Sequence, residues 1–202
     1  METAVYSGSF NPLHIGHLAI LRRLAELYDR VLLVVSPINP LKATATALDA
    51  QARLDAARAA LARHPELSGD IPSCAEQGKG CRPLHGRVSV SDIEFRLPMP
   101  NYTIDTLDAL KSENPSDSLT LVVGGDQIAD FRRWKDYRRI LTDYGAAVFP
   151  REGANTAAIR GDLLRECPRY RIRLIDMPLV PVSSTQIREA LASGKDVSTL
   201  LM

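Results

Sequence analysis

The residues Arg30–Ser36 (RVLLVVS) form a continuous apolar run that restricts the fold more than any other stretch of the chain. A strand that is apolar at every position must be covered on both faces, as strands in parallel sheets are. Short runs of this kind recur and are separated by segments with helical spacing of apolar residues. Repeated strand–helix units predict a parallel sheet with right-handed crossovers and helices on both faces. The expected fold class is therefore α/β, a Rossmann-like doubly wound sheet.

The expected strands are Thr3–Ser7, Arg30–Ser36, Arg87–Phe95, Leu119–Val123, Gly145–Phe149 and Arg171–Asp176. The expected helices are Gly16–Leu27, Ala47–Arg63, Thr103–Ser112, the polar stretch Gln127–Tyr144, Ala157–Glu166 and Ser183–Ser193. Ligands of such sheets bind beyond the carboxyl ends of the strands. Residues that directly follow strands should therefore line one rim with the ligand; they are Gly8, Pro37, Gly124, Pro150 and Pro178.

Length and charge exclude several classes of protein. The 202 residues suit a single domain, residues 1–202, with one core. A net charge of +1 argues against a nucleic-acid-binding protein. No apolar run is long enough to span a bilayer, and the chain enters a glycine turn too early for a signal peptide. We therefore expect a cytoplasmic protein with no nucleic-acid or membrane partner.

The segment Leu67–Gly86 is rich in Gly, Pro and Ser and is expected to be a surface insertion or mobile loop. It contains Cys74, Cys81 and His85, which raise the possibility of a zinc site. The spacing lacks a C-x-x-C pair and a clear fourth ligand, so no metal site is predicted. With Cys167 the chain has three cysteines, too few for a disulfide framework.

The stretch from Val5 to His17 carries the strongest chemical signal. An apolar strand breaks at Gly8, where the backbone can approach a ligand closely, and a helix follows. The unpaired N–H groups and positive dipole end of a helix start suit a phosphate group. His14 and His17 are three residues apart, so both imidazoles project from one face. Two proton-bearing rings over an anion site indicate catalysis rather than packing.

A second phosphate signal lies near the other end of the chain. Ser183 and Gln186 form a capping box, which alone would indicate only a helix start. Arg188 lies one turn further on, so hydroxyls, free N–H groups and a guanidinium converge. We expect both ends of the chain to build one cationic cradle for a polyphosphate.

The residues Gly8–His17 (GSFNPLHIGH) resemble the nucleotide-binding signature of the HxGH nucleotidyltransferases, and among these they look like the nicotinate-nucleotide adenylyltransferases. Ser183–Arg188 (SSTQIR) is similar to the SSTxIR motif of that family. The resemblance implies a nucleotidyltransferase-type domain in which His17 stabilises charge on the α-phosphate and the departing pyrophosphate, with Gly16 leaving room for the adenosine. It implies the catalytic residues His14, His17, Lys42 and Arg188, and the ATP-binding residues Gly8, Ser9, Phe10, Gly16, Ser183, Ser184 and Thr185.

Further segments extend the resemblance. Asn39–Lys42 resembles a loop in which a lysine binds phosphate, and Arg53 lies where the family often carries an arginine, although a helix-face arginine is usually solvated. Asn101–Leu107 is similar to the SYTxxTL segment, with Asn101 in place of serine. Trp134 is either a stacking partner for a pyridine ring or a core residue. The implied substrate-binding residues are Asn11, Tyr102, Thr103, Gly124, Asp126, Trp134 and Arg151.

The reaction implied is transfer of AMP from ATP, with its Mg²⁺, to nicotinate mononucleotide, giving nicotinate adenine dinucleotide and pyrophosphate. The acceptor phosphate is already an oxyanion, so neither a strong general base nor a covalent nucleotidyl-enzyme is expected. Alternatives are another acceptor, such as nicotinamide mononucleotide or phosphopantetheine, and a regulatory module without turnover. His14–His17 also spells the class I aminoacyl-tRNA synthetase signature, but the chain is too short and lacks the second, lysine-rich signature. A homo-oligomer stays an open possibility.

Overall fold

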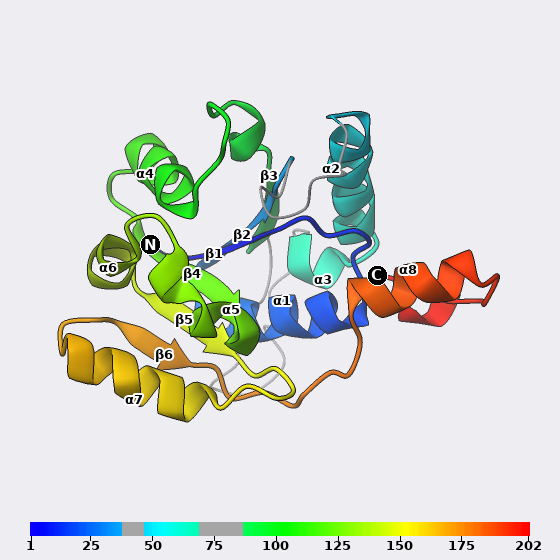
Figure 1. Ribbon diagram of the computed structural model, residues 1–202. Helices are drawn as coiled ribbons and strands as arrows, with labels where there is room; N and C mark the ends of the chain where they lie inside the picture. Colours follow the sequence, from blue (N-terminus) through cyan, green and yellow to red (C-terminus); the bar gives the residue numbers. More distant parts are fainter. Residues whose placement is uncertain (38–46, 69–86) are drawn as a thin grey trace, which may run out of the picture.

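The computed structural model describes residues 1–37, 47–68 and 87–202. A six-stranded parallel sheet runs through it in the order β3-β2-β1-β4-β5-β6 (Figure 1). The strands are β1 (Glu2–Gly8), β2 (Arg30–Val35), β3 (Val88–Ser91), β4 (Ser118–Gly124), β5 (Ala146–Phe149) and β6 (Ile172–Leu174). The prediction of a Rossmann-like, doubly wound α/β sheet is confirmed.

Helices cover both faces of this sheet. The longer ones are α1 (Ile15–Leu27), α2 (Ala47–Ala62), α4 (Thr103–Glu113), α7 (Thr156–Glu166) and α8 (Ser184–Ala192), and the shorter ones α3 (Pro65–Ser68), α5 (Gly125–Ala129) and α6 (Tyr137–Arg139). Side chains of α1, α2 and α3 share one core layer, and side chains of α4, α5 and α7 share the other. Val31, Leu33 and Val35 of β2 enter the first layer, whereas Leu32 and Val34 enter the second. Burial on both faces explains why β2 is apolar throughout.

The chain reverses its winding between β1 and β4. After β1 it passes to α1 in the first layer, and after β4 it passes to α5, whose Ile128 belongs to the second layer. Tyr6 pairs with Val122, so Gly8 and Gly124 end neighbouring strands at the same edge. The two following segments diverge there and leave a crevice, which is where sheets of this type bind ligands.

Two expected elements differ from the structure. The strand predicted for Arg87–Phe95 ends at Ser91, and Ile93–Phe95 is a 3₁₀ turn. The helix predicted for Gln127–Tyr144 is broken into α5, the 3₁₀ turn Phe131–Arg133, α6 and the π turn Ile140–Tyr144. The break has a backbone cause, because Trp134 is extended and Asp136 has a left-handed φ of 51°.

The segment after α8 returns to the start of α1. Ser198–Leu200 forms a 3₁₀ turn, and Leu201 then makes an antiparallel bridge with His14. Met202 is 5% exposed and belongs to the core layer of α1. Figure 1 shows the C-terminus close to α8 and α3. Among the described residues, no helix has the length and apolar character needed to cross a membrane.

Candidate active site

The two histidines hold each other at the start of α1. His14 is the N-cap residue, and its Nδ1 accepts a hydrogen bond from the Gly16 N–H at 3.1 Å. The Nδ1 of His17 accepts from the His14 N–H at 3.2 Å, and the ring centroids are 3.8 Å apart. Since Nδ1 is the acceptor in both rings, this network assigns the hydrogen of each neutral ring to Nε2. Each imidazole therefore keeps an Nε2–H donor for a ligand.

Both imidazoles are neutral at pH 7. Burial, with a smaller contribution from the positive charge of Arg151, lowers the pKa of His14 to about 4. Burial also lowers the pKa of His17 well below its usual value, and the proximity of His14 and Arg151 adds to this effect. The rings thus offer hydrogen-bond donors but carry no positive charge at pH 7. A polyphosphate at this place would raise the pKa of both rings again.

The lack of a side chain at Gly16 leaves space for the His14 ring. A Cβ at Gly16 would lie 2.9 Å from Cε1 and Nδ1 of that ring, which is closer than real contacts allow. The resemblance implies that Gly16 leaves room for the adenosine, and in the structure the His14 ring lies against Gly16. Any larger residue at position 16 would displace the ring and its hydrogen bond to the backbone.

The start of α8 contacts the turn that precedes α1. Arg188 Nη1 donates to the Asn11 carbonyl at 2.7 Å, and the Ser184 hydroxyl donates to the Pro12 carbonyl at 3.1 Å. The capping box expected from Ser183 is present, since its Oγ accepts from the Gln186 N–H at 3.2 Å. The expectation that the two ends of the chain meet at one place is confirmed by these contacts.

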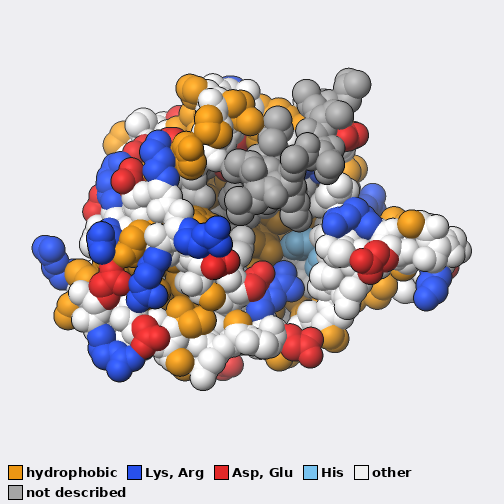
Figure 2. Space-filling view, viewed as in Figure 1, with side chains coloured by type: hydrophobic (Ala, Val, Ile, Leu, Met, Phe, Trp, Pro, Cys, Tyr) orange, Lys and Arg blue, Asp and Glu red, His pale blue; other side chains and the backbone are white. Residues whose placement is uncertain are grey.

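A shallow recess opens beside the histidines, and we call it the histidine recess. His14, Gly16, His17, Phe149, Arg151 and Val180 are among the residues that line it. Figure 2 shows histidine atoms in a hollow next to the α8 end of the molecule. The structure thus places Arg151, a predicted substrate residue, together with the predicted catalytic pair.

Arg151 also reaches the second half of the crevice. Its guanidinium lies over the Phe149 ring at 5.3 Å, and its Nε is 3.9 Å from Asp126 Oδ1. That Nε atom is buried and makes no hydrogen bond within the described part of the chain. Gly124 lies against the same side chain, because a Cβ there would be 3.3 Å from Arg151 Cγ. Gly124 and Asp126 therefore lie against Arg151, which lines the histidine recess.

Tyr102 and Thr103 begin α4, as the sequence predicts. Tyr102 is the N-cap residue and is 40% exposed. Lys135 Nζ lies 4.6 Å above the Tyr102 ring and donates to Asp105 at 2.9 Å. This contact brings the segment of Trp134 to the start of α4.

Trp134 is partly buried. Its ring packs on Phe131 with centroids 4.6 Å apart and planes 30° from parallel, and it borders the second core layer. The two interpretations of this residue are therefore compatible, with one part of the indole against the core and one part exposed.

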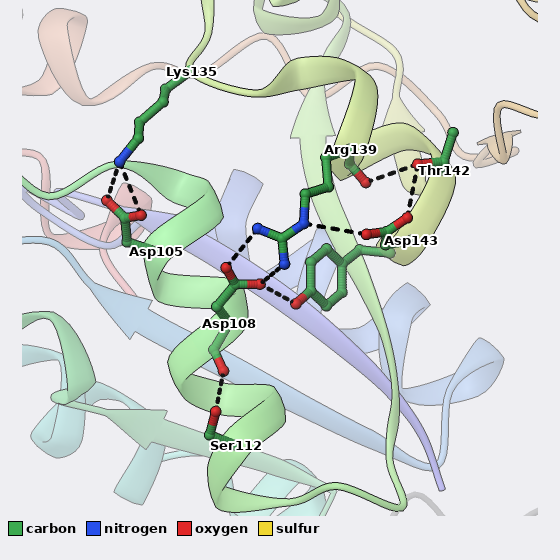
Figure 3. Close-up of polar contacts among 8 residues, drawn as sticks. Asp105, Asp108, Ser112, Lys135, Arg139, Thr142 and Asp143 are labelled. Atoms are coloured by element: carbon green, nitrogen blue, oxygen red, sulfur yellow. Dashed lines mark hydrogen bonds and ion pairs between the residues drawn. The ribbon is translucent and has the colours of Figure 1, made fainter.

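An ion-pair network holds the Trp134 segment against α4, and Figure 3 shows it. Asp108 accepts two hydrogen bonds from Arg139, at 2.8 and 2.7 Å, and a further one from the Tyr144 hydroxyl. Arg139 Nε donates to Asp143 at 3.3 Å, and Lys135 pairs with Asp105 at one end of the network. Most of these groups are exposed, so this half of the site is held largely by solvated contacts.

Prediction from the sequence missed the buried Glu94 and treated Arg53 as a helix-face arginine of a usually solvated kind. Glu94 is 5% exposed, and its Oε1 accepts from the hydroxyls of Ser7 and Thr106, both at 3.1 Å, which joins the end of β1 to α4. Arg53 is 7% exposed and donates to carbonyls that follow β1 and β2, so it is not a solvated helix-face arginine. Arg53 shares the buried face of α2 with Ala50 and Ala57, but the alanine-rich sequence of this helix has no apolar stripe that would indicate it.

Some predicted residues lie outside the described part of the chain. They are Lys42, Cys74, Cys81 and His85, and most of the predicted insertion lies there too. Its first residue, Leu67, is described and is fully buried within α3. Among the described residues, no group of three or more His, Cys, Asp and Glu side chains could hold a metal ion.

A family model described as cytidylyltransferase-like matches residues 5–190. The sheet and its crevice agree with this class of protein. A curated relative from Flavobacterium psychrophilum, named "Probable nicotinate-nucleotide adenylyltransferase", is 37% identical over 203 residues, covering 100% of this chain and 92% of its own. A relative of the same name from Bacteroides fragilis is 37% identical over 202 residues, covering 99% of this chain and 87% of its own. The chain belongs to the cytidylyltransferase-like family, among its nicotinate-nucleotide adenylyltransferases.

Two solved structures share the fold. Both are of Plasmodium falciparum nicotinic acid mononucleotide adenylyltransferase, one complexed with NaAD and one complexed with APC. The first has a TM-score of 0.71 at 18% identity, covering 98% of this chain and 87% of that chain. The second has a TM-score of 0.70 at 17% identity, covering 99% and 90%. At this level of identity the likeness concerns the fold.

Proposed function

We propose that this protein transfers AMP from ATP to nicotinate mononucleotide, releasing pyrophosphate and forming nicotinate adenine dinucleotide, and that residues 1–202 act as one nucleotidyltransferase domain. The observation that carries the proposal is the contact of Arg188 and Ser184 with the turn before α1. It brings the helix starts of α1 and α8 together beside two neutral histidines. The start of α1, both histidines and Arg151 line the recess, and the start of α8 with Arg188 contacts the adjoining turn. Helix starts, Nε2–H donors and guanidinium groups gathered in this way suit a polyphosphate.

In this proposal the chain acts by alignment and charge stabilisation. The acceptor phosphate attacks the α-phosphate of ATP, its oxyanion being ready at neutral pH, and pyrophosphate leaves. His14, His17 and Arg188 bind the phosphates and stabilise the charge that develops on the pyrophosphate, with Lys42 as a further phosphate ligand. Mg²⁺ enters as part of the MgATP substrate. Further ATP contacts come from Gly8, Ser9, Phe10, Gly16, Ser183, Ser184 and Thr185.

The acceptor binds on the side of the crevice formed by the start of α4 and the segment after β4, which we call the β4 side; the side formed by the turn after β1 is the β1 side. Backbone N–H groups at the start of α4, at Thr103, donate hydrogen bonds to the pyridine carboxylate. The exposed part of Trp134 stacks on the pyridine ring. Arg151 lies between this side and the histidines, which suits a contact with the acceptor phosphate. The remaining proposed acceptor contacts are Asn11, Tyr102, Gly124 and Asp126.

A panel of acceptors tests the proposal. The protein with MgATP is supplied in turn with nicotinate mononucleotide, nicotinamide mononucleotide and phosphopantetheine, and pyrophosphate release is measured. We expect kcat/KM to be largest with nicotinate mononucleotide. A larger kcat/KM with another acceptor would identify that compound as the substrate in place of nicotinate mononucleotide. ATP binding without pyrophosphate release with any acceptor would indicate a regulatory module.

A further inference from the structure

The turn between β1 and α1 is held by donors from distant parts of the chain. Four carbonyl groups between Ser9 and Leu13 each receive a hydrogen bond from another element. The pairs are Arg53 Nη1 to Ser9 O at 2.7 Å, Arg188 Nη1 to Asn11 O at 2.7 Å, Ser184 Oγ to Pro12 O at 3.1 Å and Met202 N to Leu13 O at 3.4 Å. A turn whose carbonyl groups are fixed in this way has its peptide planes fixed as well.

Arg53 is buried and makes more hydrogen bonds than the other donors. From α2 it also donates to the carbonyls of Ser36 at 2.8 Å and Pro37 at 2.7 Å, where the chain leaves β2. Its fork of N–H groups thus ties together the segments that leave two neighbouring strands. A lysine ammonium in the same place is a single centre on a flexible stem and cannot span all of these acceptors with the same geometry.

The backbone that Arg53 holds is strained. Phe10 has a φ of 44°, which is unusual for a bulky residue, and its ring is 5% exposed. Such a conformation persists only when surrounding contacts impose it. The peptide unit that joins Ser9 to Phe10 is planar, so the Phe10 N–H lies opposite to the Ser9 carbonyl that Arg53 holds.

We propose that Arg53 is a positioning residue for the phosphates of ATP. By holding the Ser9 carbonyl against the end of β2, it maintains the turn at Phe10 and directs the Phe10 N–H away from α2 for use by the polyphosphate. This inference rests on the proposed function, because it assigns the polyphosphate to this turn. Arg53 does not touch the reacting atoms.

The test compares Arg53→Lys and Arg53→Ala with wild type, and Arg58→Ala serves as control. Arg58 is an arginine of the same helix whose contacts are exposed ion pairs with Asp55 and Asp92. The measurements are the affinity for the non-hydrolysable analogue α,β-methylene-ATP with Mg²⁺, and kcat and KM for both substrates. Hydrogen exchange of peptides that cover Gly8–Leu13 reports directly on the turn.

For Arg53→Lys we expect analogue affinity and KM for ATP each to worsen about tenfold, the size expected for lost hydrogen bonds to a charged group. KM for the pyridine nucleotide should stay within about twofold, because those contacts lie on the β4 side. Exchange over Gly8–Leu13 should accelerate while that of α1 stays unchanged. Arg53→Ala should show the same pattern more strongly, and Arg58→Ala should match wild type.

The proposal is overturned if Arg53→Lys binds the analogue as wild type does, or if the KM values of both substrates rise together. Should Arg53→Ala fail to fold, Arg53→Lys still decides, because it keeps the charge and most of the volume. A wild-type protein that released no pyrophosphate with any acceptor would refute the proposed function instead. Analogue affinity would still test Arg53 in that case.

Discussion

The two halves of the crevice are built by different kinds of contact. On the β1 side, His14, His17 and Arg53 are at most 7% exposed and bond to the backbone. On the β4 side, the Tyr102 and Trp134 segments are joined by ion pairs such as Lys135 with Asp105, whose side chains are 42% and 43% exposed. Buried backbone contacts resist both salt and local opening, whereas exposed pairs do so weakly.

This difference suggests a division of labour. The half proposed for ATP is held by buried hydrogen bonds to the backbone, which suits a reaction that depends on alignment of charged groups. The half proposed for the acceptor can adjust at low cost, because its contacts exchange readily with water. Changes on the β1 side should therefore affect turnover, and changes on the β4 side should affect the KM of one substrate.

The largest effect is expected from His17→Ala. The variant loses one Nε2–H donor aimed at developing charge, so kcat should fall by about 10²–10³ while the protein still folds. Steady-state pyrophosphate release checks the rate, and thermal unfolding checks the fold. His64→Ala, a histidine bonded to Glu66 outside the recess, is the control and should keep full activity. Near-wild-type turnover of His17→Ala would remove its catalytic role.

Trp134→Ala should raise KM for the pyridine nucleotide by about tenfold, since stacking on an aromatic side chain contributes ~1–3 kcal/mol. KM for ATP should stay nearly constant, because the ring packs on Phe131 at the second core layer and does not line the histidine recess. Trp134→Phe should recover most of the affinity. Equal increases in both KM values would instead assign Trp134 to the core alone.

The stability of the ligand-free protein should depend on pH through the histidine pair. In the unfolded chain a histidine binds protons below pH ~6.5, whereas folded His14 does so only near its pKa of about 4. Between these values the unfolded state holds more protons, so the free energy of unfolding should fall as the pH falls from 6.5 to 4. Urea unfolding across this range measures the slope, and the double variant His14→Gln, His17→Gln should reduce it. An unchanged slope in the double variant would contradict the neutral, buried pair.

The smallest effect is expected from Lys135→Met. The lost contacts with Asp105 and Tyr102 are exposed and screened, so KM for the pyridine nucleotide should rise less than about threefold. In wild type, 0.5 M salt should produce a similar change, and the variant should respond less to salt. An effect as large as that of Trp134→Ala would show that the β4 side is as tightly organised as the β1 side.

Local pattern was sufficient for the architecture and for many residues of the proposed phosphate site. The uniform apolarity of β2 predicts burial on both faces. The three-residue spacing of His14 and His17, after the strand break at Gly8, predicts that both imidazoles project from one face. The capping box at Ser183 is equally local, because a cap is a contact within one turn. These features depend on neighbours in sequence, so the sequence alone determined the α/β class, the histidine pair and the second helix start.

Only the tertiary structure decided how the turn at Phe10 is held and how Trp134 is placed. Arg53 and Glu94 act through partners far away in sequence, and no periodicity distinguishes a clamping arginine from a solvated one. The break of the expected helix around Trp134 likewise follows from packing on Phe131 and from the left-handed Asp136, which outweigh helix propensity. The physical reason is the range of the interactions, because propensity and capping act within a turn whereas burial and long-range hydrogen bonds exist only once the sheet has formed.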